Sequence, residues 1–165
     1  MAICLLGPLT VHGSEHVSPR DRVVLTALAL AGGDVVPAER LADALWGDEP
    51  PPSWTKVVQG SVVRLRRTLG PSAVETSTGG YRLTLPRDDV DVLRFERLLD
   101  DARSLVTHGE DGRAAATLSA ALALWRGPAL RDVEHWAVGR EARARLQDER
   151  RDAEELLLER RGRLG

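Results

Sequence analysis

The chain has 165 residues and a formal net charge of −2, with 42% hydrophobic and 29% charged residues, which are ordinary values for one or two small globular domains. No apolar stretch approaches the roughly 18 residues that a membrane span needs, and the first residues carry neither the basic region nor the cleavage site of a signal peptide. A single cysteine, Cys4, excludes an internal disulfide bond and a cysteine-based zinc site. We therefore expect a cytoplasmic protein that needs no cofactor.

The net charge hides an uneven distribution of charged residues. Between Glu49 and Glu75 the sequence has no acidic residue, and most acidic residues follow Pro86. A local basic surface, more than the net charge, determines whether a protein can face a phosphate backbone, so a nucleic-acid partner remains compatible with this composition. The window without acidic residues contains the basic residues Lys56, Arg64, Arg66 and Arg67.

Turn and capping residues divide the first half of the chain into short elements. Ser18 and Pro19 are typical of a helix start, and Gly32 with Gly33 is typical of a helix end. In chain order we expect a strand over residues 2–11 that is interrupted at Gly7-Pro8, a short strand over 15–18, a helix from Pro19 to about Ala31, and a helix that opens at 34–37 and stops at Gly47.

A third helix and a hairpin complete this half. Three consecutive prolines separate the third helix from the second, and we expect it to run from Ser53 or Thr55 to Leu69. Two β runs, over 74–76 and 81–85, flank a turn that contains two glycines. A helix, a turn, a second helix and a hairpin in this order predict a winged helix-turn-helix domain.

After Pro86 the pattern becomes helical throughout. Apolar residues recur at helical spacing over 91–107, 113–125 and 134–161, which is typical of a tetratricopeptide-like helical repeat. The sequence thus predicts a mainly α protein with small β-sheets, in which a winged helix-turn-helix domain (1–86) precedes a helical-repeat domain (87–165). Solenoids usually need about three repeats, so we expect the second domain to be incomplete. Because the motif set of the first domain is complete, we expect residues 1–86 to fold and to bind DNA weakly by themselves.

The third helix is predicted to have two different faces. An apolar stripe at helical spacing, made by Val58, Val62, Leu65 and Leu69, should pack on the first two helices. The outward face can then enter the major groove of DNA, which admits one α-helix. That face carries Lys56, Gly60, Val63 and Arg67, with Gln59, Arg64 and Arg66 on its flanks.

The expected DNA contacts follow from these faces. Glutamine pairs with adenine and arginine with guanine, so Gln59 and Arg64 are the candidates for base reading, whereas Lys56, Arg66 and Arg67 are assigned to phosphates. Gly60 either allows close approach of the helix backbone to DNA or is simply tolerated, at a cost of about 1 kcal/mol relative to alanine. The complete expected DNA-binding set, hairpin included, is Thr55, Lys56, Gln59, Gly60, Ser61, Val63, Arg64, Arg66, Arg67, Thr78 and Arg82.

An enzymatic function has little support in these residues. No serine lies in a Gly-x-Ser-x-Gly context, and the histidines show no metal-ligand spacing, so we expect neither catalytic nor metal-binding residues. The histidines are His12, His16, His108 and His135.

Two further non-enzymatic interpretations remain open. In the first, the helical half, with Trp125 and Trp136, is a protein-interaction or sensor module, the winged helix is its scaffold, and the basic helix face is merely solvated. In the second, the chain is the N-terminal piece of a larger signalling protein that has an ATPase or sensor domain. Only phosphate neutralisation predicts a DNA affinity that falls steeply with salt.

Six motifs follow one another along the chain, at residues 5–11 (LLGPLTV), 41–47 (LADALWG), 62–70 (VVRLRRTLG), 79–83 (GGYRL), 91–95 (DVLRF) and 121–130 (ALALWRGPAL). Together and in this order they resemble the antibiotic regulatory protein (SARP) family of actinobacterial activators. The resemblance implies an OmpR/PhoB-like winged helix followed by a bacterial transcriptional activation domain that is longer than the part present here. It further implies double-stranded DNA, as promoter direct repeats, and the RNA polymerase holoenzyme as partners. A homodimer on DNA stays open, because no heptad pattern predicts one.

The sequence departs from the family's pattern within the third helix and the hairpin. The family commonly has a polar residue, often asparagine, at the position of Lys56, and often a bulky residue at the position of Ser61. The turn over 76–80 also lacks the arginine that is often found there. The resemblance therefore implies a DNA sequence preference that differs from that of better-known members.

Overall fold

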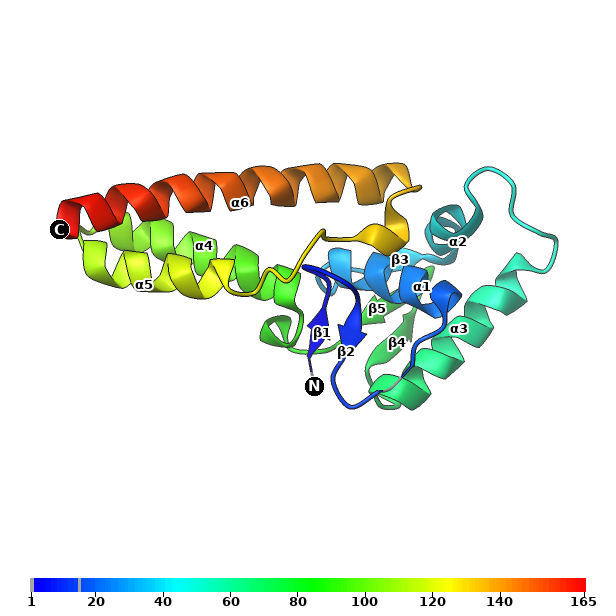
Figure 1. Cartoon of the computed structure of the whole chain (residues 1–165). Helices are drawn as coiled ribbons and strands as arrows, with labels where there is room; N and C mark the ends of the chain where they lie inside the picture. Colours follow the sequence, from blue (N-terminus) through cyan, green and yellow to red (C-terminus); the bar gives the residue numbers. More distant parts are fainter. Residues whose placement is uncertain (1, 15) are drawn as a thin grey trace.

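The computed structural model describes residues 2–14 and 16–165, which form an elongated molecule with a winged-helix half and a helical half (Figure 1). The first half contains β1 (Ile3–Cys4), β2 (Thr10–Val11), α1 (Pro19–Leu30), β3 (Val36–Pro37), α2 (Ala38–Trp46), α3 (Trp54–Leu69), β4 (Val74–Ser77) and β5 (Gly80–Leu83). The second half contains η1 (Arg87–Asp89), α4 (Asp91–Thr107), α5 (Asp111–Leu122), η2 (Arg131–Val133) and α6 (Ala137–Leu164), where η denotes a short 3-10 helix. The predicted fold class, mainly α with small β-sheets, is confirmed.

The ends of α1 follow from its capping residues. The Ser18 hydroxyl accepts a hydrogen bond from Asp21 N at 3.3 Å, and Pro19 occupies the first turn, where its missing N–H removes no helical bond. Gly32 and Gly33 adopt φ angles of 62° and 99°, which turn the chain out of the helix. Residues 24–29 are all buried, so α1 is the central helix on which α2 and α3 pack.

The β elements differ in two places from the sequence prediction. Val36 and Pro37, which were expected to open the second helix, form β3 and pair antiparallel with β5, with Val36 opposite Tyr81. This pairing makes a three-stranded sheet of order β3-β5-β4, and local sequence does not reveal it because the partner strand lies far along the chain. Of the strand expected over 15–18, Glu15 lies outside the described residues and 16–18 form no strand.

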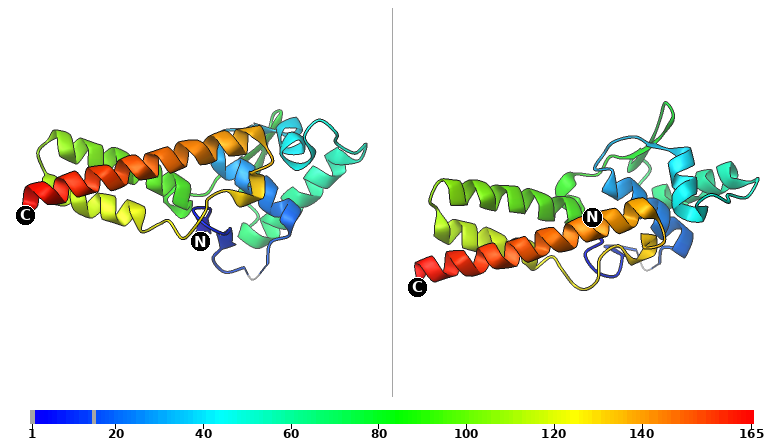
Figure 2. Two further views of the ribbon diagram at one scale, coloured as in Figure 1. Left: turned by 45° about the horizontal axis from the view of Figure 1, so that its top comes forward. Right: turned by 90° about the horizontal axis from the view of Figure 1, so that it is seen from above.

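The helical half consists of the helix pair α4 and α5, with α6 packed along α5 (Figures 1 and 2). α4 spans the residues predicted for it, but α5 ends at Leu122 and residues 123–125 leave the helix. Trp125 packs edge-on against Phe95 with ring centroids 5.5 Å apart, and Trp136 is buried. Both tryptophans therefore contribute to packing within the chain.

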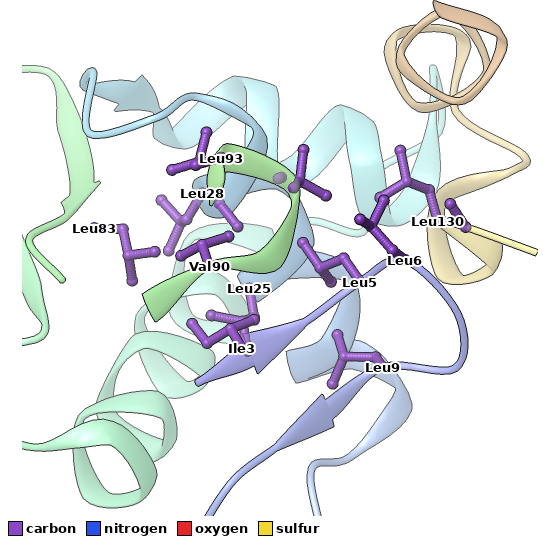
Figure 3. Close-up of a cluster of buried hydrophobic side chains, with 14 of the residues drawn as sticks. Ile3, Leu5, Leu6, Leu9, Leu25, Leu28, Leu83, Val90, Leu93 and Leu130 are labelled. Carbon is purple, nitrogen blue, oxygen red and sulfur yellow. The ribbon is translucent and has the colours of Figure 1, made fainter. Parts of the chain in front are cut away.

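One hydrophobic core extends through both halves of the molecule (Figure 3). The N-terminal segment lies between α1 and the start of the helical half, so its side chains contact both. The buried residues that meet there include Ile3, Leu5, Leu6, Leu25, Leu28, Val90, Leu93 and Leu130.

Hydrogen bonds fasten the N-terminal segment to the helical half. The Asp91 carboxylate accepts hydrogen bonds from Leu5 N at 2.7 Å and from Leu6 N at 2.9 Å. The carbonyl oxygens of Leu5 and Leu6 accept from Leu130 N and Arg126 N, at 3.2 and 2.7 Å. Residues beyond Pro86 therefore complete the surroundings of the N-terminal segment, so we expect residues 1–86 alone to be less stable than the full chain.

Candidate nucleic-acid interface

The faces of α3 are those that its residue spacing predicts. Its apolar stripe is at most 7% exposed, and α3 packs on α1 and α2. Within the described part of the chain, the side chains of Lys56 and Arg67 form no hydrogen bond or ion pair, so both charges face solvent. The exposed side chains of the outward face are Thr55, Lys56, Gln59, Val63 and Arg67, with the half-buried Gly60 among them.

Ser61 does not belong to this outward face, which corrects the prediction from sequence. Its side chain is completely buried, because position 61 lies in the same stripe as Val58 and Leu65. Its hydroxyl accepts a hydrogen bond from Arg64 Nη2 at 3.2 Å. Ser61 therefore supports a neighbouring side chain and cannot contact DNA from this position.

Arg64 is held by an acidic residue of α1. Its Nε and Nη2 donate to the two carboxylate oxygens of Asp21 at 2.8 and 2.9 Å, a two-point ion pair. The Asp21 side chain is only 6% exposed, whereas the Arg64 side chain is 47% exposed. Because Nε and Nη2 are engaged, Nη1 is the nitrogen of Arg64 that is left to contact a ligand.

The electrostatics of this pair keep both partners charged. Burial by itself would raise the pKa of the Asp21 carboxyl, but hydrogen bonds with Arg64, Ser61 and Ser18 outweigh burial and lower the pKa below its ordinary value. The hydrogen bond to Asp21 in turn raises the pKa of the Arg64 guanidinium. Arg64 is thus a fixed cation at the edge of the exposed face of α3.

Arg66 connects α3 to the hairpin. Its Nε donates to the carbonyl oxygen of Val74 at 2.8 Å, and its Nη2 donates to Thr76 Oγ1 at 2.8 Å. Arg66 is half-buried, so its main role in this structure is to hold β4 against the helix, although it was expected to contact a phosphate.

The hairpin beside α3 has an exposed tip. Thr78 is exposed at the turn, and Arg82 is exposed on β5, where its Nη2 lies 2.7 Å from Glu75 Oε2. Gly80 is required where β5 crosses β3, since an added Cβ would lie 2.0 Å from the Val36 carbonyl oxygen. The hairpin is therefore anchored at its base and open at its tip.

α3 lies at the end of the molecule opposite the C-terminus (Figures 1 and 2). The hairpin of β4 and β5 lies next to it, because β4 contacts α3. Sequence reasoning missed Asp21, whose only signal was an acidic residue in the first turn of α1. Nothing in its local pattern indicates a partner on another helix.

Comparison with known proteins places a known domain in each half of the chain. Residues 13–83 match the model of the family "Transcriptional regulatory protein, C terminal", and residues 90–165 match that of the "Bacterial transcriptional activator domain". No helix in the described ranges is both long and apolar enough to span a bilayer.

Among curated relatives, "Regulatory protein DnrI" of Streptomyces peucetius is 37% identical over all of this chain and 66% of its own length. "Transcriptional regulator RedD" of Streptomyces coelicolor is 31% identical over 94% of this chain and 48% of its own length. The structure of Mycobacterium tuberculosis EmbR, solved in complex with a low-affinity phosphopeptide, matches 96% of this chain and 45% of that protein with a TM-score of 0.86 and 28% identity. The chain thus spans about two thirds or less of these relatives.

A winged helix with an exposed basic helix, joined to a region that matches an activator domain, defines the class of transcription regulators. The chain belongs to the antibiotic regulatory protein (SARP) family of these regulators. This assignment agrees with the order of the sequence motifs.

Proposed function

We propose that the chain is a sequence-specific DNA-binding transcription activator that inserts α3 into the major groove of double-stranded DNA. The observation that carries this proposal is the outward face of α3, on which Lys56 and Arg67 are exposed and unpaired in the described structure and no acidic side chain occurs. An α-helix with such a face fits the width of the major groove. The hairpin would lie beside it as the wing.

The residues divide by the contacts that they can make. Gln59 and Val63 face outward from the middle of α3, where an amide can pair with adenine and an apolar group can contact the thymine methyl. Lys56 and Arg67 are assigned to phosphates, which position the protein without reading sequence. Arg64 donates to a base or phosphate through Nη1 while Asp21 holds its other nitrogens.

The remaining assignments follow from family membership. We propose promoter direct repeats as the DNA site, contact with the RNA polymerase holoenzyme, and action in the cytoplasm, where chromosomal DNA lies. Two copies would occupy a pair of repeats, with or without a contact between them. We also place the domain boundary near Pro86, in the segment between the two matched regions.

The test is the selection of duplexes from a random pool at two salt concentrations, followed by affinity measurements on the selected duplex. We expect one selected sequence and an association constant that falls steeply with salt, because binding releases counterions from neutralised phosphates. Lys56→Ala and Arg67→Ala should each reduce the slope of log K against log salt by about 1.

Arg94→Ala is the matched control, because Arg94 is exposed on α4 and belongs to neither α3 nor the hairpin. It should leave the slope unchanged. A pool from which the protein selects no sequence, or a slope that is equal in all four proteins, would contradict the proposed function.

A further inference from the structure

Two neighbouring residues of α1 form ion pairs in different directions. Asp21 binds Arg64 of α3, as described above, and Arg22 binds Asp132 of η2. The second pair is also bidentate, because Arg22 Nε donates to Asp132 Oδ1 at 3.0 Å and Arg22 Nη2 donates to Asp132 Oδ2 at 3.3 Å. The first turn of α1 therefore forms ion pairs both with α3, the helix proposed to bind DNA, and with η2 of the helical half.

The Asp132 end of this connection is rigid. The following residue, Val133, is completely buried, and Gly139 of α6 approaches it so closely that an added Cβ would lie 2.3 Å from the Val133 carbonyl oxygen. Two residues before Asp132, Leu130 adopts φ 57° and donates its N–H to Leu5 O. Asp132 thus has a fixed place relative to α6 and to the N-terminal segment.

The position of the Arg64 side chain is also closely constrained. The Asp21 carboxylate is nearly buried, and Ser61 and Ser18 bond to the same pair from both sides. A shift of the first turn of α1 would therefore change the geometry of Arg64 before it changed that of the exposed Lys56 or Arg67. Two-point ion pairs transmit such a shift because both distance and angle are fixed.

We propose that Asp21 and Arg22 act as a relay, by which the helical half sets the orientation of Arg64 and so tunes the DNA sequence preference of α3. In this proposal, which rests on the proposed function, Asp132 is a positioning residue for DNA recognition although it lies outside the winged helix. A ligand or partner that moves η2 would change which sequences the protein selects, and not merely how tightly it binds.

The relay is tested by Asp132→Asn, which keeps the shape of the side chain and removes its charge. The probes are the duplex selected by the wild-type chain and a scrambled duplex of the same composition. We expect the ratio of the two affinities to fall about fivefold, the lower end of typical coupling between sites. A double variant that exchanges the two charges, Arg22→Asp with Asp132→Arg, should restore part of the lost ratio between the affinities for the selected and the scrambled duplex.

Asp88→Asn is the matched control, because Asp88 forms a similar two-point pair with Arg97 but within the helical half. It should leave the affinity ratio unchanged. A second readout needs no DNA: the NMR signal of Arg64 Nε–H should exchange with water faster in Asp132→Asn than in the wild type, because its hydrogen bond to Asp21 loosens.

The outcomes separate the two proposals. An unchanged ratio with unchanged Arg64 exchange overturns the relay, and so does an equal loss of affinity for both duplexes, which indicates a purely structural role. A wild-type chain that does not discriminate between the duplexes overturns the proposed function and the relay together. A reduced ratio with faster Arg64 exchange supports the relay.

Discussion

Gly60 lies on the outward face of α3, where packing among the described residues does not require a glycine. A Cβ added there would lie 3.3 Å from Nη1 of Arg64, and no other described atom outside the backbone of α3 would lie within 4 Å. Since glycine destabilises a helix interior by about 1 kcal/mol relative to alanine, its presence here favours close approach of the helix backbone to a ligand over simple tolerance.

Gly60→Ala should therefore raise thermal stability and lower DNA affinity at the same time. We expect about 1 kcal/mol of added unfolding free energy from the helix propensity and a several-fold weaker complex with the selected duplex. Gly162→Ala is the matched control, because Gly162 is a helical glycine of α6 with open space around it. Equal DNA binding by both variants would show that Gly60 is only tolerated.

Asp91 connects the halves through a buried carboxylate. Burial raises the pKa of this carboxyl, although hydrogen bonds from Leu5 N and Leu6 N lower it in part. Asp91→Ala would leave both N–H groups without their acceptor, and we expect about 2 kcal/mol of lost unfolding free energy in urea titrations. Asp100→Ala, at a side chain that is 78% exposed, should change stability by less than about 0.5 kcal/mol.

At the scale of elements, the hairpin depends on α3 for its position. Arg66→Ala removes two hydrogen bonds to β4 and should speed amide hydrogen exchange in β4 and β5, with about 1 kcal/mol of lost stability. Arg67→Ala is the neighbouring control and should leave hairpin exchange unchanged. If both variants exchange alike, Arg66 does not anchor the hairpin.

The helices were predictable from sequence because their signals are local. The apolar residues of α3 recur at helical spacing, and the capping residue of α1 directly precedes that helix. Both helices can therefore be recognised from the local sequence alone. β3 was not predictable, since a two-residue strand has no pattern of its own and exists only through its partner β5. The long helices and the local pairing of β4 with β5 could thus be predicted, but β3 and its long-range pairing with β5 could not.

The candidate site was predictable only for side chains that point to solvent. Helical spacing separates buried from exposed faces, which identified Lys56, Gln59 and Arg67. Ser61 was misplaced because its polarity suggested exposure, whereas Ser61 is buried and its hydroxyl accepts a hydrogen bond from Arg64 at the edge of the helix. The role of Asp21 depends on a contact across two helices, and no spacing rule contains that information.

At the scale of the whole molecule, the two halves share a core. A fragment of residues 1–86 would lack the groups that cover Ile3, Leu5 and Leu6, and burying one such side chain contributes about 2 kcal/mol. We expect this fragment to unfold at a much lower urea concentration than the full chain, as followed by circular dichroism. A midpoint equal to that of the full chain would contradict a shared core.

The hydrogen bonds from the N-terminal segment to Asp91 and Leu130 also affect the order in which the protein folds during synthesis. Residues 5 and 6 are synthesised early, but their partners follow at 91, 126 and 130. Contacts of such long sequence separation form late, so the first segment must wait, exposed, while most of the chain is translated. The nascent winged helix would therefore remain incomplete, and a candidate for chaperone binding, until the loop before α6 has left the exit tunnel.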